Sequence, residues 1–143
     1  MLKTGILNPA INSLISRVRH TNTLVIADRG FPSWPQIETI DISLVDDMPR
    51  VLDVVRAIRS NFVVGRAFMA EEFLAANGND VRLEFEQALS GVPLIFEPHV
   101  QFKKRVPQAV GLVRTGDTIQ YANLIIESGS AQAAGTTGFS SAW

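Results

Sequence analysis

The sequence predicts a single α/β domain, a three-layer α/β/α arrangement around a central sheet that is mostly parallel or mixed. Three observations support this. A chain of 143 residues suits one hydrophobic core. Short apolar runs that are typical of strands alternate with segments of helical periodicity. Glycine and proline fall between these segments, so each run is short enough to form one element.

The N-terminal region contains the clearest helix and the clearest strand. Asn8 and Pro9 are typical of a helix start. Apolar residues follow at the spacing of one helix face: Ile11, Leu14, Ile15 and Val18. The run 23–27, TLVIA, is continuously apolar and ends at Asp28, shortly before Gly30. It therefore predicts a buried central strand.

The remaining elements continue the alternation. The pattern predicts a short strand at 37–42 and then a helix that Pro49 opens and Asp46 or Asp47 caps. A strand is expected at 62–69, and residues 70–76 could equally continue as a helix, so that boundary is left open. A helix with one apolar face at 81–89 and a strand at 93–96 follow. From His99 the pattern is helical again. Two further strands are expected at 109–113 and 122–126.

Composition excludes several classes of function. The 13 basic and 14 acidic residues nearly cancel, so no basic surface for nucleic acid is expected. The chain has no cysteine and only two histidines, which excludes thiolate catalysis and argues against a zinc site. No apolar run reaches the length of about 18 residues that a membrane helix needs, and the apolar run at the N-terminus is too short to predict a signal peptide. We therefore expect a cytoplasmic protein.

The two histidines are the first candidates for proton transfer, because imidazole titrates nearest to neutral pH. His20 follows the first predicted helix, and His99 begins a later one. Lys103 lies four residues after His99, so both side chains can face one ligand. The structural alternatives are that His20 bonds helix carbonyls and that His99 and Lys103 form a solvated helix face.

Other polar residues also lie at element ends. Asp28 ends the first strand, and Tyr121 and Asn123 flank the start of the last one. Asp28 could also bond turn amides, and Tyr121 and Asn123 could serve only strand packing and pairing. The adjacent pair Glu71 and Glu72 is expected on a solvated helix face, because neighbouring helix positions point about 100° apart.

Three stretches contain most of these polar residues. In chain order they are LNPAINSLISRVRHTNTLVIADRGFP, HVQFKK and RTGDTIQYANLIIESG. Together, and in this order, they resemble the ribose pyranase and fucose mutarotase family of sugar-anomer enzymes. The resemblance extends over roughly residues 4–129, with a weaker middle.

The resemblance implies a cofactor-free interconversion of ribose between pyranose and furanose forms, with mutarotation as a companion activity. It assigns proton transfer to His20, and a helix dipole in front of His20 would favour its protonated form. The positions it assigns to sugar contacts are Asp28, His99, Tyr121 and Asn123. Lys103 matches a lysine that usually follows the second motif histidine. The presence of His99 resembles the ribose branch more than the fucose branch.

Strand geometry indicates that one chain does not complete the site. His20 precedes the strand at 23–27 and Asp28 follows it. Extended residues at about 3.3 Å each place the two roughly 17 to 20 Å apart. We therefore expect pockets at subunit boundaries. The resemblance independently implies a ring-like homo-oligomer, such as a decamer or an octamer.

Other functions are also compatible with the sequence. The same reaction on fucose or another sugar is one, and a non-catalytic sugar-binding accessory or regulatory protein is another. A nucleotide-binding domain is disfavoured, because no glycine-rich phosphate loop follows any strand. Residues 1–129 are predicted to form a sugar pyranase/mutarotase-like domain. Residues 130–143, with Phe139 and Trp143, are predicted to form a flexible tail or an interface strap.

Overall fold

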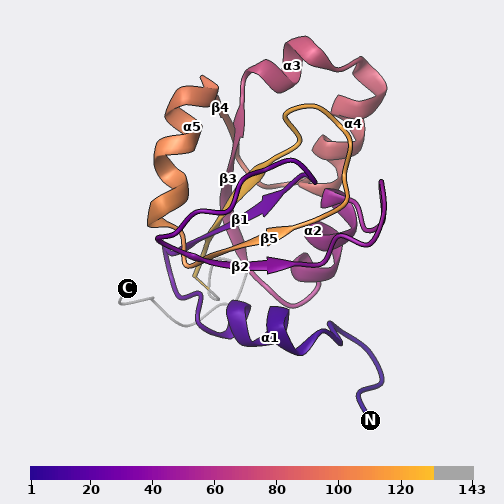
Figure 1. Ribbon diagram of the computed structural model, residues 1–143, viewed down its shortest axis with the longest axis vertical. Helices are drawn as coiled ribbons and strands as arrows, with labels where there is room; N and C mark the ends of the chain where they lie inside the picture. The colour runs from indigo at the N-terminus through magenta and orange to yellow at the C-terminus, as the bar shows by residue number, and fades with distance from the viewer. Residues whose placement is uncertain (131–143) are drawn as a thin grey trace.

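A six-stranded sheet forms the centre of the computed structural model, which describes residues 1–130 (Figure 1). The strands are β1 (Thr23–Ala27), β2 (Glu38–Asp41), β3 (Val64–Ala70), β4 (Leu94–Glu97), β5 (Gly111–Arg114) and β6 (Leu124–Ser128). The helices are α1 (Pro9–Ser16), α2 (Val51–Arg59), α3 (Glu72–Ala76), α4 (Asn79–Ala88), α5 (His99–Arg105) and the 3₁₀ turn η1 (Val106–Gln108). The predicted elements are all present and differ only at their ends.

The sheet is mixed, and one strand alone runs against the others. The strand order is β2-β5-β1-β6-β3-β4. β6 pairs antiparallel with both β1 and β3, whereas every other pair is parallel. The carboxyl ends of β1 to β5 and the start of β6 therefore lie along one edge of the sheet. We call this the carboxyl edge.

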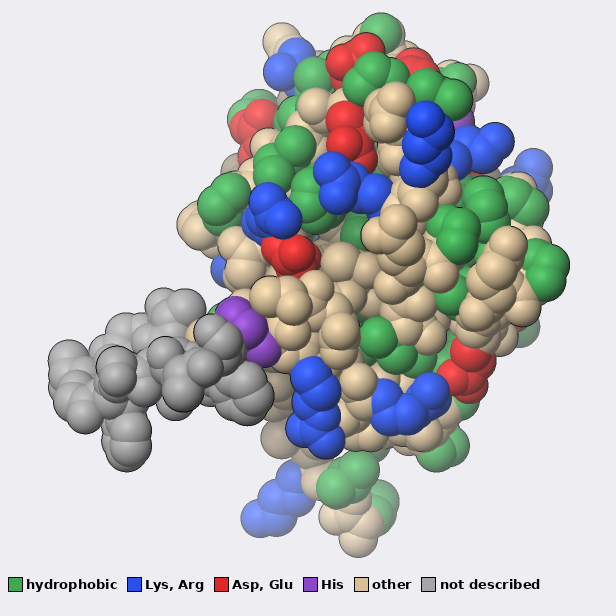
Figure 2. Space-filling model, turned by 90° about the vertical axis from the view of Figure 1, so that its left-hand side faces the viewer, with side chains coloured by type: hydrophobic (Ala, Val, Ile, Leu, Met, Phe, Trp, Pro, Cys, Tyr) green, Lys and Arg blue, Asp and Glu red, His purple; other side chains and the backbone are tan. Residues whose placement is uncertain are grey.

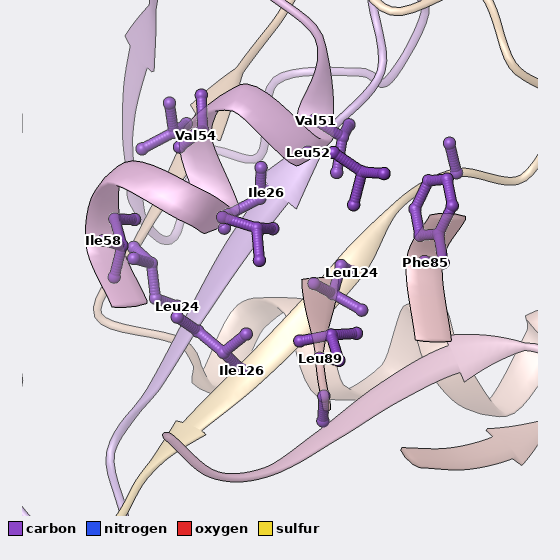
Figure 3. Close-up of a cluster of buried hydrophobic side chains, with 14 of the residues drawn as sticks. Leu24, Ile26, Val51, Leu52, Val54, Ile58, Phe85, Leu89, Leu124 and Ile126 are labelled. Carbon is purple, nitrogen blue, oxygen red and sulfur yellow. The ribbon is translucent and has the colours of Figure 1, made fainter. Parts of the chain in front are cut away.

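Helices cover both faces of the sheet, which confirms the predicted three layers. Residues from α1 to α4 pack with Leu24 and Ile26 on one face (Figure 3). Phe102 of α5 packs with Val25 on the other face. Alternate residues of β1 thus enter opposite cores, as the period of a strand requires. From Leu24 onward β1 is fully buried, in agreement with its continuous apolar sequence.

The first helix is shorter than its apolar pattern suggests. The side chain of Asn8 accepts a hydrogen bond from the Ile11 amide at 3.0 Å, so the predicted cap is correct. The helix ends at Ser16, and His20 follows in a turn closed by a 3.0 Å hydrogen bond from the Asn22 amide to the Arg19 carbonyl. The prediction that His20 directly follows the helix end is therefore wrong.

The predicted cap of α2 is also wrong. Neither Asp46 nor Asp47 caps it, because Asp46 pairs with Arg29 at 2.5 Å and Asp47 accepts hydrogen bonds from Thr118. The helix begins at Val51, whose amide donates to the carboxylate of the remote Asp117 at 2.9 Å. The acceptor for the Val51 amide therefore comes from the loop between β5 and β6, whereas the Arg50 amide donates to Asp53 at 2.8 Å.

The sequence also predicted a C-terminal tail and the absence of a membrane helix. The tail predicted for residues 130–143 lies, apart from Ser130, outside the described residues. Among residues 1–130, the helices lack the length and apolar character that crossing a membrane requires.

Candidate functional site

An open pocket with a volume of about 360 Å³ lies at the carboxyl edge. It brings together five of the six residues that the sequence proposed as a site: Asp28, His99, Lys103, Tyr121 and Asn123. They come from the end of β1, from α5 and from the loop that enters β6. Residues far apart in sequence meet there because β6 lies next to β1 and runs against it.

Asp28 and Asn123 form one wall of the pocket. Asn123 is buried, and its side-chain oxygen accepts a hydrogen bond from the Asp28 amide at 2.8 Å. The Asp28 carboxylate in turn accepts from the Gly30 amide at 3.0 Å. Burial raises the pKa of Asp28 above its ordinary value of 3.8, and outweighs the Gly30 hydrogen bond that lowers it. Asp28 therefore serves its turn and lines the pocket at once.

His99, Lys103 and Tyr121 form the opposite wall. His99 begins α5, and Lys103 follows one turn later with an exposed side chain. The His99 ring meets the edge of Tyr121 with 5.3 Å between the ring centroids and stacks on the buried Phe102 at 6.0 Å. Within residues 1–130, the buried Nδ1 of His99 has no hydrogen-bond partner.

The pocket contains residues that the sequence did not single out as site residues. These are Gly30, Phe31, Pro32 and Gln120. Gln120 adjoins Tyr121 and the other three follow Asp28 within four positions, and that proximity was the available signal. Trp34 does not line the pocket but packs on Phe31, with 6.5 Å between the ring centroids.

The chemistry of the lining suits a polyol. A carboxylate, an amide, a phenol, an imidazole and an ammonium group provide donors and acceptors, and Phe31 and Pro32 add an apolar surface. Within residues 1–130, no three His, Asp or Glu side chains gather where a metal ion could bind. The pocket residues are thus suited to hydrogen-bonding hydroxyl groups.

His20 does not reach this pocket. It lies in the turn before β1, and the neighbouring Thr21 amide donates to the carbonyl of Ser128, at the far end of β6, at 2.9 Å. His20 is thus at the opposite edge of the sheet from Asp28. Figure 2 shows the two histidine side chains of the chain, in purple, well apart on the surface. The pocket of one chain therefore lacks the proposed proton-transfer group.

Comparison with known proteins places the chain in a family. The model of the RbsD / FucU transport protein family matches residues 1–131. The chain belongs to the RbsD / FucU family. D-ribose pyranase from Geobacillus kaustophilus is 40% identical over 129 residues, which cover 90% of this chain and 94% of the relative. D-ribose pyranase from Geobacillus thermodenitrificans is also 40% identical, and the match covers 97% of its length. The family predicted from the three motifs is confirmed.

Solved structures of the RbsD / FucU family share the fold. A structure of Bacillus subtilis RbsD complexed with D-ribose matches with a TM-score of 0.84 and 30% identity, covering 91% of this chain and 98% of RbsD. Fucose mutarotase from Streptococcus pneumoniae, in complex with L-fucose, matches with a TM-score of 0.78 and 18% identity, covering 91% of this chain and 99% of the mutarotase. At that identity the second match supports the fold alone.

Proposed function

We propose that this chain is a cofactor-free isomerase that interconverts the pyranose and furanose forms of D-ribose and exchanges their anomers. The supporting observation is the pocket at the carboxyl edge, which gathers Asp28, His99 and Lys103 with two further predicted site residues. The D-ribose pyranases that share 40% of its residues support ribose as the sugar.

The reaction needs one proton to leave the anomeric hydroxyl and one to reach the ring oxygen. The ring bond to the anomeric carbon then breaks, and a different hydroxyl of the open aldehyde closes the new ring. A single group that titrates near neutral pH serves both directions. We assign this role to His20. Asp28 accepts hydrogen bonds from sugar hydroxyls, and Lys103 donates to sugar oxygens.

The position of His20 makes assembly part of this proposal. Because His20 and Asp28 lie at opposite edges of one sheet, the pocket of one subunit receives His20 from a neighbour. A closed ring of identical subunits satisfies this at every pocket. We therefore propose a homo-oligomeric ring, such as a decamer or an octamer, with pockets at its subunit boundaries. A cytoplasmic location also stays a prediction.

The test is NMR saturation exchange between the ring forms of D-ribose. We expect the wild-type chain to accelerate this exchange and the variant His20→Ala to lose most of it, about 100-fold or more, while D-ribose binding is retained. Exchange that the substitution leaves unchanged would remove His20 from the mechanism. Binding without wild-type exchange would favour a non-catalytic sugar-binding protein. Faster exchange of L-fucose than of D-ribose would favour a fucose mutarotase.

A further inference from the structure

The short helix α3 lies next to the pocket wall that His99, Lys103 and Tyr121 form. None of its residues lines the pocket. Phe73 fixes the helix to the core, since its buried ring packs on Phe85 with 4.8 Å between the ring centroids. Glu72, the first residue of α3, and Asn77, the residue that follows the helix, then bond the backbone on the two sides of this wall.

Glu72 holds the start of α5. Both of its carboxylate oxygens accept from the His99 amide, at 3.0 and 3.2 Å. The residue before His99 is Pro98, which offers no side-chain cap to this helix. Glu72 therefore supplies the missing acceptor from another element and fixes the backbone of His99. The sequence expectation of a solvated pair holds for the exposed Glu71 and is wrong for the half-buried Glu72.

Asn77 holds the other side of the same wall. Its side-chain amide donates to the Gln120 carbonyl at 2.9 Å and to the Phe73 carbonyl, in its own helix, at 3.0 Å. The Gln120 carbonyl belongs to the peptide that leads into Tyr121. Tyr121 has a φ of 57°, a left-handed conformation that is uncommon for a bulky residue. The Asn77 hydrogen bond therefore stabilises an unfavourable backbone conformation and with it the direction of the Tyr121 ring.

We propose that Glu72 and Asn77 are positioning residues that together set the contact between His99 and Tyr121. This contact is edge-on, with an interplanar angle of 79°. The part of the inference that concerns sugar affinity rests on the proposed function. The part that concerns ring geometry does not depend on it.

The geometric part is tested by NMR of the imidazole protons without sugar. The Tyr121 ring current acts on the His99 resonances, and His20, the second histidine, is an internal control because it lies at the other edge of the sheet. We expect Glu72→Ala and Asn77→Asp to shift the His99 resonances. Glu71→Ala, which removes the adjacent exposed carboxylate, is the matched control and is expected to shift neither histidine. Unmoved His99 resonances in both variants would overturn the inference.

The affinity part is tested by titrating D-ribose against the same variants. We expect Glu72→Ala and Asn77→Asp to raise the Kd for D-ribose roughly tenfold, because side chains that are no longer held in place contact the sugar with poorer geometry. Glu72→Gln keeps one acceptor oxygen for the His99 amide and should restore most of the affinity. It also serves as the folded variant if Glu72→Ala does not fold. A lower Tm with unchanged Kd and unchanged His99 resonances would mean a purely structural role and would contradict the proposal. Failure of the wild-type chain to bind D-ribose would instead contradict the proposed function.

Discussion

Partial burial of the Asp28 carboxylate destabilises the folded state, and a residue that only closes a turn would not require that charge. Burial raises the pKa of its carboxyl, and the negative charge of Asp117 raises it further. The Gly30 amide alone would be satisfied by a neutral side-chain oxygen. A half-buried carboxylate at the pocket wall is therefore better explained by a ligand that donates hydrogen bonds to it.

The destabilising burial of this carboxylate predicts how Asp28→Asn changes stability and sugar binding. The pKa in the folded protein is above the unfolded value, so the ionised carboxylate destabilises the fold at neutral pH. We expect the variant to have a higher Tm at pH 7, by on the order of 2 °C. We also expect it to bind D-ribose roughly tenfold more weakly, because a charge-assisted hydrogen bond is lost.

Thermal unfolding across pH checks the sign of this prediction. The gain in Tm should shrink as the pH falls from the raised folded pKa of Asp28 toward 3.8 and vanish below 3.8, where Asp28 is protonated in both the folded and the unfolded state. If Asp28→Asn is less stable than the wild type at pH 7, Asp28 is not a binding residue whose charge destabilises the fold.

Single residues were also where sequence reasoning worked best and where it failed. Asp28, His99 and Lys103 could be predicted because they lie at element ends within recognisable motifs. The role of Glu72 could not, because its partner is a backbone amide 27 positions away that no side-chain pattern reveals. Gln120 has no distinguishing chemistry, so only its position beside Tyr121 pointed to it.

At the scale of elements, α2 depends on a residue that local sequence could not identify. Asp117 is fully buried and accepts hydrogen bonds from the amides of Val51 at 2.9 Å and of Ile119 at 2.8 Å. It thereby joins the start of α2 to the loop that leads into the pocket. Local patterns predicted the helix correctly but gave its cap to nearby aspartates, because a cap from 66 positions away leaves no local signal.

We expect Asp117→Ala to lower the free energy of unfolding by about 2–4 kcal/mol, because two amides lose their acceptors in a buried site. Urea unfolding measures this directly. Asp46→Ala is the control, since Asp46 is one of the two caps that local sequence suggested. Its pair with Arg29 is exposed, so the expected loss is at most about 0.5 kcal/mol. Equal losses in the two variants would show that Asp117 does not cap α2.

Element ends differ from the prediction where pairing decides them. The sequence suggested that the last strand starts at residue 122, but β6 begins at Leu124, which pairs with Ile26. Asn123 lies beyond that pair and bonds the Asp28 amide with its side chain. β6 thus starts at the border of the pocket, and this boundary depends on pairing with β1 and not on local propensity.

At the scale of the whole molecule, strand order creates the pocket. The sequence indicated a mixed or parallel sheet in three layers, but local patterns do not contain strand order. The antiparallel β6 between β1 and β3 brings Asn123 beside Asp28 at the carboxyl edge. The same arrangement leaves His20 at the opposite edge, which strand length alone was enough to predict.

In the proposed assembly, His20 and the pocket of one active site belong to different subunits. This arrangement is tested most directly by mixing two inactive chains, His20→Ala and the double variant Asp28→Ala/His99→Ala, through unfolding and joint refolding. Each chain refolded alone should exchange the ring forms of D-ribose at most about a hundredth as fast as the wild type does. Random mixing should restore exchange at about a quarter of the sites, those where an intact pocket meets an intact neighbouring His20. Mixed assemblies that bind D-ribose and remain inactive would contradict the account.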